Sequence, residues 1–417
     1  MTHPRAPQRL LMVMPYHQLV RKAVAAGFRV WSIWDPALQE PPYLDEVERH
    51  SEQLLLSDFS DETALRALIA ETARAHSIDL VIHLGSEASM PPVAAEAEAL
   101  GLAPNPAEAV RSLNDKAAMR RMLNAAGLSP VEARRAATVG EVREILRDAV
   151  LPVIVKPATL AGSRGVALIR CPEDVDAWAQ RVRTGSLAGP YLVEDYLEGP
   201  EFSVETLSAG GVHRVVGITA KQTSGAPGFV ETGHVFPAPL PAADRTAIER
   251  LVTDLLELAG YVFGPAHTEV ILTRRGPRIV ESQARLGGDR IPLLIETATG
   301  FDIESWIFRA LAGEPVVPPS AHRYAAIEFF RLPPGRLESA APAAEVTAAP
   351  HVHALHFPFA PGAEIKPITD SSTRHGYAVV DAPTPAEAAV RLSAVLDTLR
   401  PVVSTPTHLM EGAGALC

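Results

Sequence analysis

The sequence is poor in cysteine, in positive charge and in long apolar runs, and each shortage excludes a class of protein. Its 417 residues include two cysteines, Cys171 and Cys417, which cannot form a disulfide framework. The 38 basic residues are outnumbered by 49 acidic ones, and a net charge of −11 has the wrong sign for a protein that coats nucleic acid. No apolar run reaches the roughly 18 residues of a membrane span. We therefore expect a cytoplasmic globular protein that binds neither nucleic acid nor membrane.

Lysine is also scarce. Only five of the 38 basic residues are lysines, namely Lys22, Lys116, Lys156, Lys221 and Lys366. Arginine is thus the default cation of this chain. A lysine inside a motif therefore indicates a need for a compact point charge rather than a planar fork.

The first 110 or so residues alternate between short apolar runs and helical periodicity. The predicted strands are 10–14, 29–33, 53–56 and 79–84, and the predicted helices are 19–26 and 62–75. This alternation predicts an α/β fold with a parallel sheet covered by helices on both faces. No Gly-x-Gly-x-x-Gly follows the first strand, so a Rossmann dinucleotide site is not supported. Glu87 follows the last of these strands, where α/β sheets bind ligands; substrate contact and helix capping are the alternatives for it.

After residue 113 the pattern changes. A helical stretch with a break at 127–130 extends to about residue 147, and short antiparallel strands joined by glycine-bearing turns follow. Later elements are a helix over 245–260, a hairpin over 268–281 and a loop or linker over 332–350. The predicted domains are an N-terminal α/β domain (1–112), a helical connection (113–150), a central lid (151–210), a C-terminal subdomain with a mixed sheet (211–340) and a closing α/β piece (341–417).

A lysine stands directly before a glycine-rich loop. The buried strand 152–157 carries Lys156 near its end, and Gly162-Ser163-Arg164-Gly165 precedes the next strand. Glycines let backbone N–H groups approach phosphate oxygens closely. The loop joins strand to strand, which excludes a Walker A loop, because that loop opens a helix. A hairpin turn is the alternative for the loop alone, and the lysine shifts the balance toward phosphate binding.

Three oxygen-bearing side chains belong to the hairpin region. If Glu269 and Glu281 occupy adjacent strands, both carboxylates can point to one face, and Gln283 lies two residues further on. Two carboxylates and an amide oxygen are hard ligands suited to Mg²⁺ that is bound together with nucleotide phosphates. Two solvated strand glutamates are the alternative, and the upstream lysine and loop argue against it.

Four blocks in this order resemble the ATP-grasp superfamily. They are Asn114-Asp115-Lys116, the stretch 156–165, the stretch 193–205, and Glu269 with Glu281-x-Gln283-x-Arg285. Within that superfamily, the stretches 229–234 and 285–289 are similar to the L-amino acid ligases, which join amino acids. The resemblance extends over about residues 10 to 400. It implies that ATP lies between the central lid and the C-terminal subdomain.

The resemblance implies a role for each motif residue. The residues expected to bind ATP are Lys116, Lys156, Gly162, Ser163, Gly165, Glu194, Asp195, Leu197 and Glu201, with 194–197 at the adenine and Glu201 at the ribose. The expected metal ligands are Glu269, Glu281 and Gln283, which would hold two Mg²⁺ ions, or Mn²⁺ instead. The expected catalytic residues are Arg285 and Lys156, with Arg285 stabilising charge on the transferring phosphoryl group. The residues expected to bind substrate are Glu231, His234, Arg285 and Gly288, with Glu231 pairing with a substrate ammonium.

One motif position departs from the superfamily, which usually has Asn where this chain has Gln283. The amide oxygen is still present, but it lies one methylene further out. The metal geometry at this ligand is therefore open, although we expect activity to persist.

The implied function is ATP-dependent ligation of a carboxylate to an amine through an acyl phosphate, with release of ADP and phosphate. The favoured substrates are small molecules, either two amino acids or an amino acid and a peptide, and a homodimer is left open. A purine-biosynthesis or biotin-carboxylase-like ligase would keep the fold and change the acceptor, but residues 10–100 show no obvious basic cluster for a sugar phosphate. A non-catalytic nucleotide-binding protein is the third alternative. The combined presence of both motif lysines, both glutamates and Arg285 argues against it.

Overall fold

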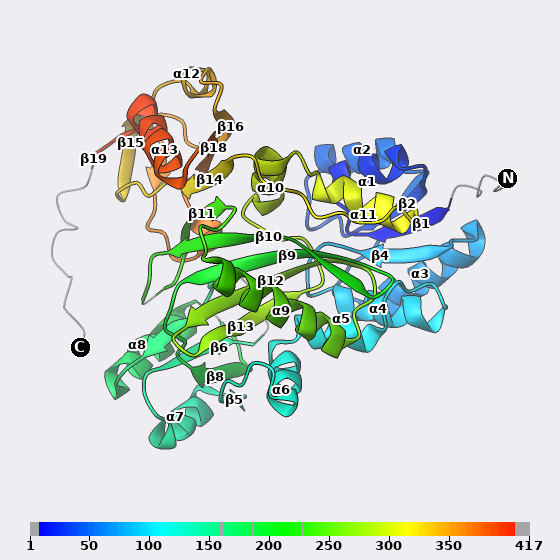
Figure 1. Cartoon of the computed structure of the whole chain (residues 1–417), viewed down its shortest axis with the longest axis horizontal. Coiled ribbons are helices and arrows are strands. Elements are labelled where there is room, and N and C mark those ends of the chain that lie inside the picture. Colours follow the sequence, from blue (N-terminus) through cyan, green and yellow to red (C-terminus); the bar gives the residue numbers. More distant parts are fainter. Residues whose placement is uncertain (1–7, 159, 161, 186, 227, 405–417) are drawn as a thin grey trace.

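The computed structural model describes residues 8–404 except 159, 161, 186 and 227. Its N-terminal part is a four-stranded parallel sheet in the order β3-β2-β1-β4, drawn in blue and cyan in Figure 1. Its elements are β1 (Arg9–Val13), α1 (His17–Ala25), β2 (Arg29–Trp34), α2 (Pro41–His50), β3 (Gln53–Leu56), α3 (Glu62–His76), β4 (Leu80–His83) and α4 (Met90–Ala99). The central strand β1 is buried from Leu10 to Val13, which explains its unbroken apolar sequence. The predicted parallel α/β arrangement is confirmed.

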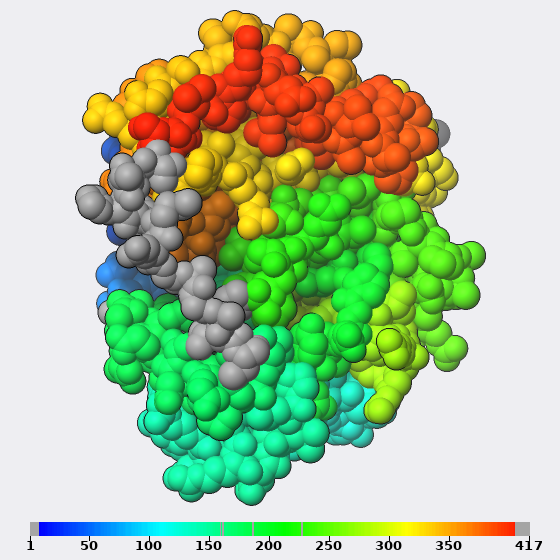
Figure 2. Space-filling model, turned by 90° about the vertical axis from the view of Figure 1, so that its left-hand side faces the viewer, coloured from blue at the N-terminus to red at the C-terminus, as the bar shows by residue number. Residues whose placement is uncertain are grey.

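A small antiparallel sheet in the order β5-β8-β6-β7, which we call the lid, combines most of the stretch 151–210 predicted to be the central lid with part of the predicted helical connection. The helices α5 (Ala107–Asn114) and α6 (Lys116–Ala126) lead into it. The lid elements are β5 (Ala133–Ala136), α7 (Val139–Asp148), β6 (Val153–Pro157), β7 (Ala167–Ile169), α8 (Pro172–Thr184) and β8 (Tyr191–Asp195). Figure 2 shows the lid at one end of the molecule and the C-terminal segments at the other, with the green middle part of the chain between them.

Two lid elements differ from the sequence prediction. β5 lies inside the stretch 113–150 that was predicted to be helical, and its Ala-Arg-Arg-Ala sequence forms a strand because it pairs with β8. The prediction of strands joined by turns omitted α8, which lies between β7 and β8. This helix packs Trp178 fully into the lid core.

The largest sheet in the described residues has eight strands in the order β13-β12-β9-β10-β11-β14-β18-β16, and all neighbouring strands are antiparallel. The prediction of a mixed sheet in the C-terminal subdomain is therefore wrong, because hairpins such as β9–β10 and β12–β13 impose antiparallel pairing. Its strands are β9 (Glu201–Ala209), β10 (Val212–Thr223), β11 (Glu231–Phe236), β12 (Gly264–Thr273), β13 (Gly276–Gln283), β14 (Tyr324–Phe329), β16 (Val352–His356) and β18 (Tyr377–Ala382). The associated helices are α9 (Ala242–Ala259), α10 (Ile291–Thr299), α11 (Ile303–Leu311) and α13 (Pro385–Leu399). Strands on both sides of the boundary proposed at 340/341 therefore share one sheet.

A third antiparallel group has the order β17-β15-β19. It consists of β15 (Gly335–Ser339), β17 (Glu364–Ile365) and β19 (Val402–Ser404), and α12 (Ala343–Thr347) and the 3₁₀ turn Ser371–Thr373 lie in the same part of the chain. The stretch 332–350, predicted to be a loop or linker, thus contains a strand and a short helix. Leu337 and Val346 are buried there, so the segment is tied to the core despite its proline content.

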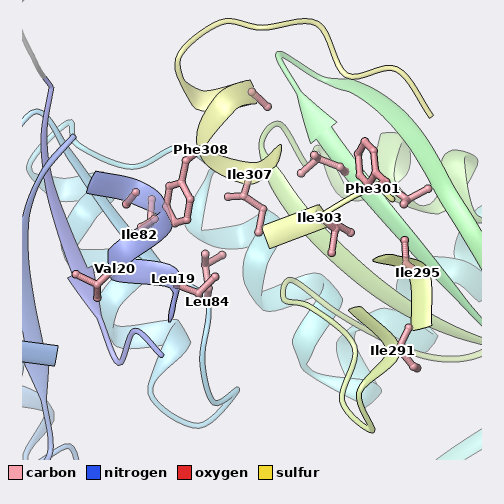
Figure 3. Close-up of a cluster of buried hydrophobic side chains, with 14 of the residues drawn as sticks. Leu19, Val20, Ile82, Leu84, Ile291, Ile295, Phe301, Ile303, Ile307 and Phe308 are labelled. Carbon is pink, nitrogen blue, oxygen red and sulfur yellow. The ribbon is translucent and has the colours of Figure 1, made fainter. Parts of the chain in front are cut away.

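The N-terminal domain and the large sheet share a hydrophobic core (Figure 3). Leu19 and Val20 of α1 and Ile82 of β4 belong to the same buried cluster as Ile307 and Phe308 of α11. Figure 3 shows Ile307 and Phe308 of α11 facing Leu19 and Leu84 of the N-terminal domain across the boundary between the two parts. This shared core places the loops that follow β1 and β4 against the end of the large sheet.

Candidate active site

A cavity of about 510 Å³ opens between the lid and the large sheet. The predicted site residues that line it are Lys116, Lys156, Gly162, Ser163, Glu194, Asp195, Leu197, Glu201, Glu231, His234, Glu269, Glu281, Gln283, Arg285 and Gly288. Gly165 lies in the same loop and packs against Pro157 and Leu187, where a Cβ atom would approach to 2.9 Å. The structure thus brings together residues from five separate stretches of the sequence.

The hairpin formed by β12 and β13 places two carboxylates side by side. Glu269 and Glu281 are direct cross-strand partners, and His267 pairs with Gln283 two residues earlier on β12. The turn between the two strands sets the register only as far as Val270 and Ile279, and a shift of one residue beyond them makes Glu269 and Glu281 partners. The predicted hairpin is confirmed, and both glutamates face the cavity.

The oxygen atoms at this point suit a hard cation. Gln283 donates from Nε2 to Glu281 Oε1 at 2.6 Å, and its own Oε1 is buried without a hydrogen-bond partner in the described chain. A buried amide oxygen without a partner, next to two carboxylates, is a donor set that fits Mg²⁺. Over the described residues, no group of three or more His, Cys, Asp or Glu side chains could hold a metal alone. A metal here would therefore need further ligands from phosphate or water.

Two motif lysines pair with carboxylates in the cavity wall. Lys116 lies 2.9 Å from Glu281. Burial would lower the pKa of Lys116, but Glu281, together with Glu269 and Glu87, raises it above its ordinary value. Lys156 Nζ lies 2.6 Å from Glu194 Oε2, and Arg120 Nε donates to the other oxygen at 2.9 Å. Burial alone would raise the pKa of Glu194, but these two cations lower it. Arg120 was not predicted, because nothing in the sequence distinguishes it from Arg121, the other arginine of α6.

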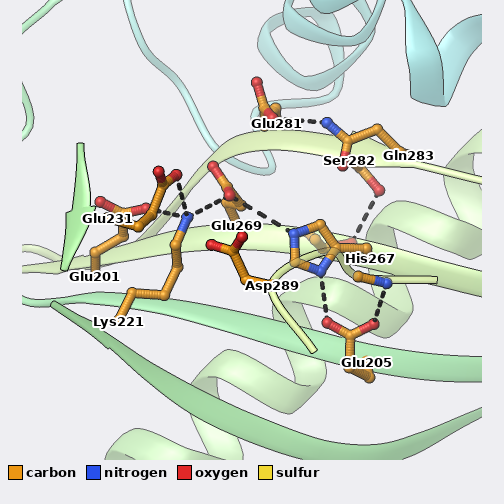
Figure 4. A network of polar contacts seen from close by, with 12 residues as sticks. Glu201, Glu205, Lys221, Glu231, His267, Glu269, Glu281, Ser282, Gln283 and Asp289 are labelled. Carbon is orange, nitrogen blue, oxygen red and sulfur yellow. Dashed lines mark hydrogen bonds and ion pairs between the residues drawn. The ribbon is translucent and has the colours of Figure 1, made fainter. Parts of the chain in front are cut away.

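Lys221 is the centre of a second network (Figure 4). Its Nζ lies 2.7 Å from Glu201, forms a short contact with Glu269 and lies 3.8 Å from Glu231. Burial would lower the pKa of Lys221, yet the surrounding carboxylates raise it well above its ordinary value. Burial would likewise raise the pKa of Glu269, but Lys221 and His267 hold it well below the usual range.

His267 links this network to the loop after β13. Its Nδ1 lies 2.5 Å from Glu205 Oε1, and its Nε2 lies 3.6 Å from Glu269. Burial opposes protonation, but the Glu205 and Glu269 carboxylates raise the pKa of His267 to about 9. Glu205 also accepts from the backbone N–H of Gly287 at 3.1 Å. Sequence reasoning missed this pair because the partners lie on different strands, 62 residues apart.

The glycine-rich loop contacts the stretch predicted to bind substrate. Ser163 donates from Oγ to the carbonyl oxygen of Phe229 at 3.0 Å. The carbonyl of Gly162 accepts from the backbone N–H of Ser371 at 3.2 Å, and Ser371 donates from its hydroxyl to Glu231. The C-terminal part of the chain therefore reaches the site through Ser371, which the sequence did not predict.

A second C-terminal residue, Arg374, anchors an acidic side chain at the same edge. Arg374 pairs with Asp289, with Nη1 3.0 Å from Oδ2, and its guanidinium stacks 3.5 Å from the ring centroid of Phe329. Asp289 Oδ2 also lies 2.9 Å from Nε2 of the buried His234, whose Nδ1 has no partner in the described chain. Burial would raise the pKa of Asp289, but His234 and Arg374 lower it strongly.

Arg285 pairs with Glu87 of the N-terminal domain. Arg285 Nε donates to Glu87 Oε1 at 2.8 Å, and Nη1 donates to the carbonyl of Leu286 at 2.7 Å. Glu87 does not cap α4, because Ser89 is the N-cap residue and no side chain caps this helix. Glu87 thus connects the N-terminal domain to the site through its ion pair with Arg285.

Comparisons with known proteins agree with this fold. Residues 149–292 match the model of an ATP-grasp domain, and residues 328–404 match L-amino acid ligase C-terminal domain 2. The L-amino acid ligase of Bacillus licheniformis superposes with a TM-score of 0.81 at 24% identity, over 96% of this chain and 100% of that one. Phosphoribosylglycinamide synthetase of Anaerococcus prevotii superposes with a TM-score of 0.69 at 17% identity, over 95% of this chain and 100% of that one. At these identities the superpositions show the fold alone.

The chain contains an ATP-grasp domain over residues 149–292. It also carries the C-terminal domain characteristic of L-amino acid ligases. Alanine–anticapsin ligase of Bacillus subtilis is 27% identical over 266 residues, which cover 58% of this chain and 56% of that protein. The chain therefore spans about half the length of the curated relatives it matches. Of the helices in the described residues, none has the length and apolarity needed to cross a membrane.

Proposed function

We propose that this chain ligates a carboxylate to an amine through an acyl phosphate, using ATP and releasing ADP and phosphate. The favoured product is a peptide bond between two amino acids, or between an amino acid and a peptide. The observation that carries the proposal is the convergence of lysines, paired carboxylates and Arg285 on one cavity. The C-terminal domain match and the likeness to alanine–anticapsin ligase support amino acids as the substrate class.

The reaction follows from the poor reactivity of a carboxylate, whose leaving group would be oxide. A carboxylate oxygen attacks the γ-phosphorus of ATP, the bond to the β-phosphate oxygen breaks, and ADP leaves. The amine then attacks the carbonyl carbon of the acyl phosphate, and phosphate departs with the C–O bonding electrons while the amine loses a proton. Phosphoryl transfer of this kind depends mostly on positioning and charge neutralisation.

The proposed roles use side chains in the cavity wall. Lys116 and Lys156 would hold ATP phosphates, and Glu194 to Leu197 with Glu201 would hold the nucleoside. Glu269, Glu281 and Gln283 would hold Mg²⁺, which supplies neutralisation of phosphate charge when bound. Arg285 would stabilise negative charge on the transferred phosphoryl group.

Glu231 would pair with the ammonium of an amino acid substrate, with His234 and Gly288 beside it. Its carboxylate lies in the cavity between Lys221 and Ser371, a site with little solvent, where an incoming cation needs a matched anion. Lys221 already offers Glu231 partial compensation at 3.8 Å. A substrate ammonium would therefore join an existing charge network.

The test is an ADP-release screen over pairs of the common amino acids, with mass spectrometry of the products. We expect ADP, phosphate and a dipeptide mass from at least one pair, and no ADP above background from Glu281→Gln under the same conditions. Bicarbonate and simple amines serve as a separate arm for the biotin-carboxylase-like alternative. Formation of AMP and pyrophosphate would contradict the proposal, because these products signal adenylation chemistry.

A further inference from the structure

A second cavity, of about 920 Å³, adjoins the first. Its walls come from the loops that follow β1 and β4 in the N-terminal domain, from the stretch 285–290 and from the ends of β14 and β18. The two cavities share Arg285, Gly288, Asp289 and Ser371. A molecule in the second cavity would therefore contact these shared residues, among them Arg285, from the side away from the first cavity.

Most charged side chains of the second cavity are already paired. Arg285 pairs with Glu87, and Arg374 pairs with Asp289. Glu304 lies 2.8 Å from Lys22 Nζ. In each of these pairs the charge of one side chain is compensated by the opposite charge of its partner.

Arg290 is the exception. Its side chain is exposed, and its guanidinium lies 5.3 Å from the ring centroid of Tyr377. Within the described residues, this side chain forms no ion pair or hydrogen bond. Asp289 and Arg290 both have a positive φ, 51° and 61°, a backbone conformation that non-glycine residues rarely adopt and that often occurs at functional sites. The loop thus presents one uncompensated cation, two residues beyond Gly288.

We propose that the second cavity binds the amine substrate and that Arg290 holds the free carboxylate of that substrate. This inference rests on the proposed ligase function and makes it more specific: the acceptor is an α-amino acid or a peptide with a free C-terminal carboxylate. One unpaired guanidinium matches a single carboxylate. A sugar phosphate shares the anionic chemistry, but its two negative charges would require more cations than the described wall offers. Tyr16, Tyr43 and Tyr377 line the same cavity and suit an aromatic or long apolar side chain.

The test compares an amino acid with its amide, which lacks the carboxylate charge. With the carboxylate substrate saturating, we expect wild-type enzyme to show a KM for the amide about tenfold above that for the acid. Arg290→Gln should raise the KM for the acid about tenfold and leave the KM values for the amide and for ATP within about twofold. Arg290→Lys should recover part of the loss, because it keeps the charge without the fork. Arg274→Gln, which removes an exposed charge from the β12–β13 turn, is the matched control and should behave as wild type.

A binding measurement separates this inference from the proposed function. Isothermal titration calorimetry of L-phenylalanine and L-phenylalaninamide, with protein loaded with magnesium and a non-hydrolysable ATP analogue, needs no turnover. If wild-type protein binds the acid more tightly than the amide, and Arg290→Gln abolishes this preference, the carboxylate site is supported. That conclusion would hold even if no pair of amino acids yields ADP and the ligase proposal fails. Equal binding of acid and amide would overturn the inference, and so would a preference for the acid that is still present in Arg290→Gln. Neither result bears on the ligase proposal, which stands if the wild-type enzyme releases ADP. Tighter binding of ribose 5-phosphate than of L-phenylalanine would also overturn it.

Discussion

Acid should destabilise the N-terminal domain through one histidine at the end of β4. His83 accepts a hydrogen bond on Nδ1 from the backbone N–H of Gly85 at 3.1 Å, and its Nε2 lies 2.8 Å from Ser89 Oγ. This pattern requires the neutral ring, and burial lowers the pKa of His83 to about 3. Protonation of Nδ1 would remove the acceptor for Gly85 and disturb the loop that carries Glu87 toward Arg285.

The magnitude follows from linkage. An unfolded histidine takes up its proton near pH 6.5, whereas folded His83 does so only near pH 3, so acid favours the unfolded chain. The stability contributed by the neutral ring is complete above pH 6.5 and is lost as the pH falls toward 3. With about 1.4 kcal/mol per pH unit, the loss between pH 7.5 and pH 5 is about 2 kcal/mol.

The assay is urea unfolding followed by tryptophan fluorescence, since Trp31 and Trp34 lie in β2 of the same domain. His83→Asn retains an acceptor oxygen near the Nδ1 position and cannot titrate. It should be less stable than wild type at pH 7.5, and the difference should shrink or reverse by about 2 kcal/mol at pH 5. His322→Asn, at an exposed position, is the control and should follow wild type at every pH. Parallel stability curves for wild type and His83→Asn would refute the reasoning.

Three further predictions concern the first cavity. Glu281→Gln should lower kcat on the order of 10²-fold or more in the ADP-release assay without markedly lowering the thermal midpoint, because neutralisation of phosphate charge acts in the transition state. Near-normal turnover would show that Glu281 is not a metal ligand. Lys156→Arg should retain less than about a tenth of the activity, because the Glu194 carboxylate already accepts a hydrogen bond from Arg120 and leaves little room for a second guanidinium. Full activity of the variant would contradict this prediction. Glu231→Ala should raise the KM for the amino acid about tenfold and the KM for ATP less than twofold. Equal changes in the two KM values would place Glu231 outside the substrate pocket.

The parts of the site that the sequence predicted are those set by local pattern. The turn at 274–276 sets the pairing of β12 and β13 as far as Val270 and Ile279, and a one-residue register shift at that point then makes Glu269 and Glu281 neighbours. Lys156 and the glycine-rich loop are adjacent in sequence, so their common position needs no long-range folding information. The α/β alternation before residue 100 likewise predicted the parallel sheet.

The residues that were missed come together only through long-range strand pairing. Ser371 and Arg374 reach the cavity because β18 pairs with β14, which pairs with β11. Asp289 and Arg374 are 85 residues apart, and arginine is so common in this chain that no single one is informative. Their ion pair therefore leaves no trace in the linear sequence.

The two lid elements differ in how far they could have been predicted. α8 has a clear signal, since Pro172 opens it and Val175, Trp178, Ala179 and Val182 follow helical spacing with all four buried. β5 has none: two arginines at its centre give no apolar alternation, and its structure depends on β8. Tertiary pairing, rather than propensity, decides the second case.

Lys221 explains in physical terms why this chain uses lysine at a few positions. Its side chain is only 4% exposed and lies among carboxylates from three strands, Glu201 of β9, Glu231 of β11 and Glu269 of β12. The three donors of an ammonium can point toward oxygens in different directions, whereas a guanidinium presents its donors in one plane. Lys22 follows the same rule on a smaller scale, because it joins Asp302 and Glu304 at 2.7 and 2.8 Å. Lys22 and Lys221 therefore mark places where several carboxylates converge on a point, whereas the exposed Lys366 forms no ion pair within the described residues. Lys116 and Lys156 each pair with one carboxylate, and the proposed function would add the phosphates of ATP to these anions.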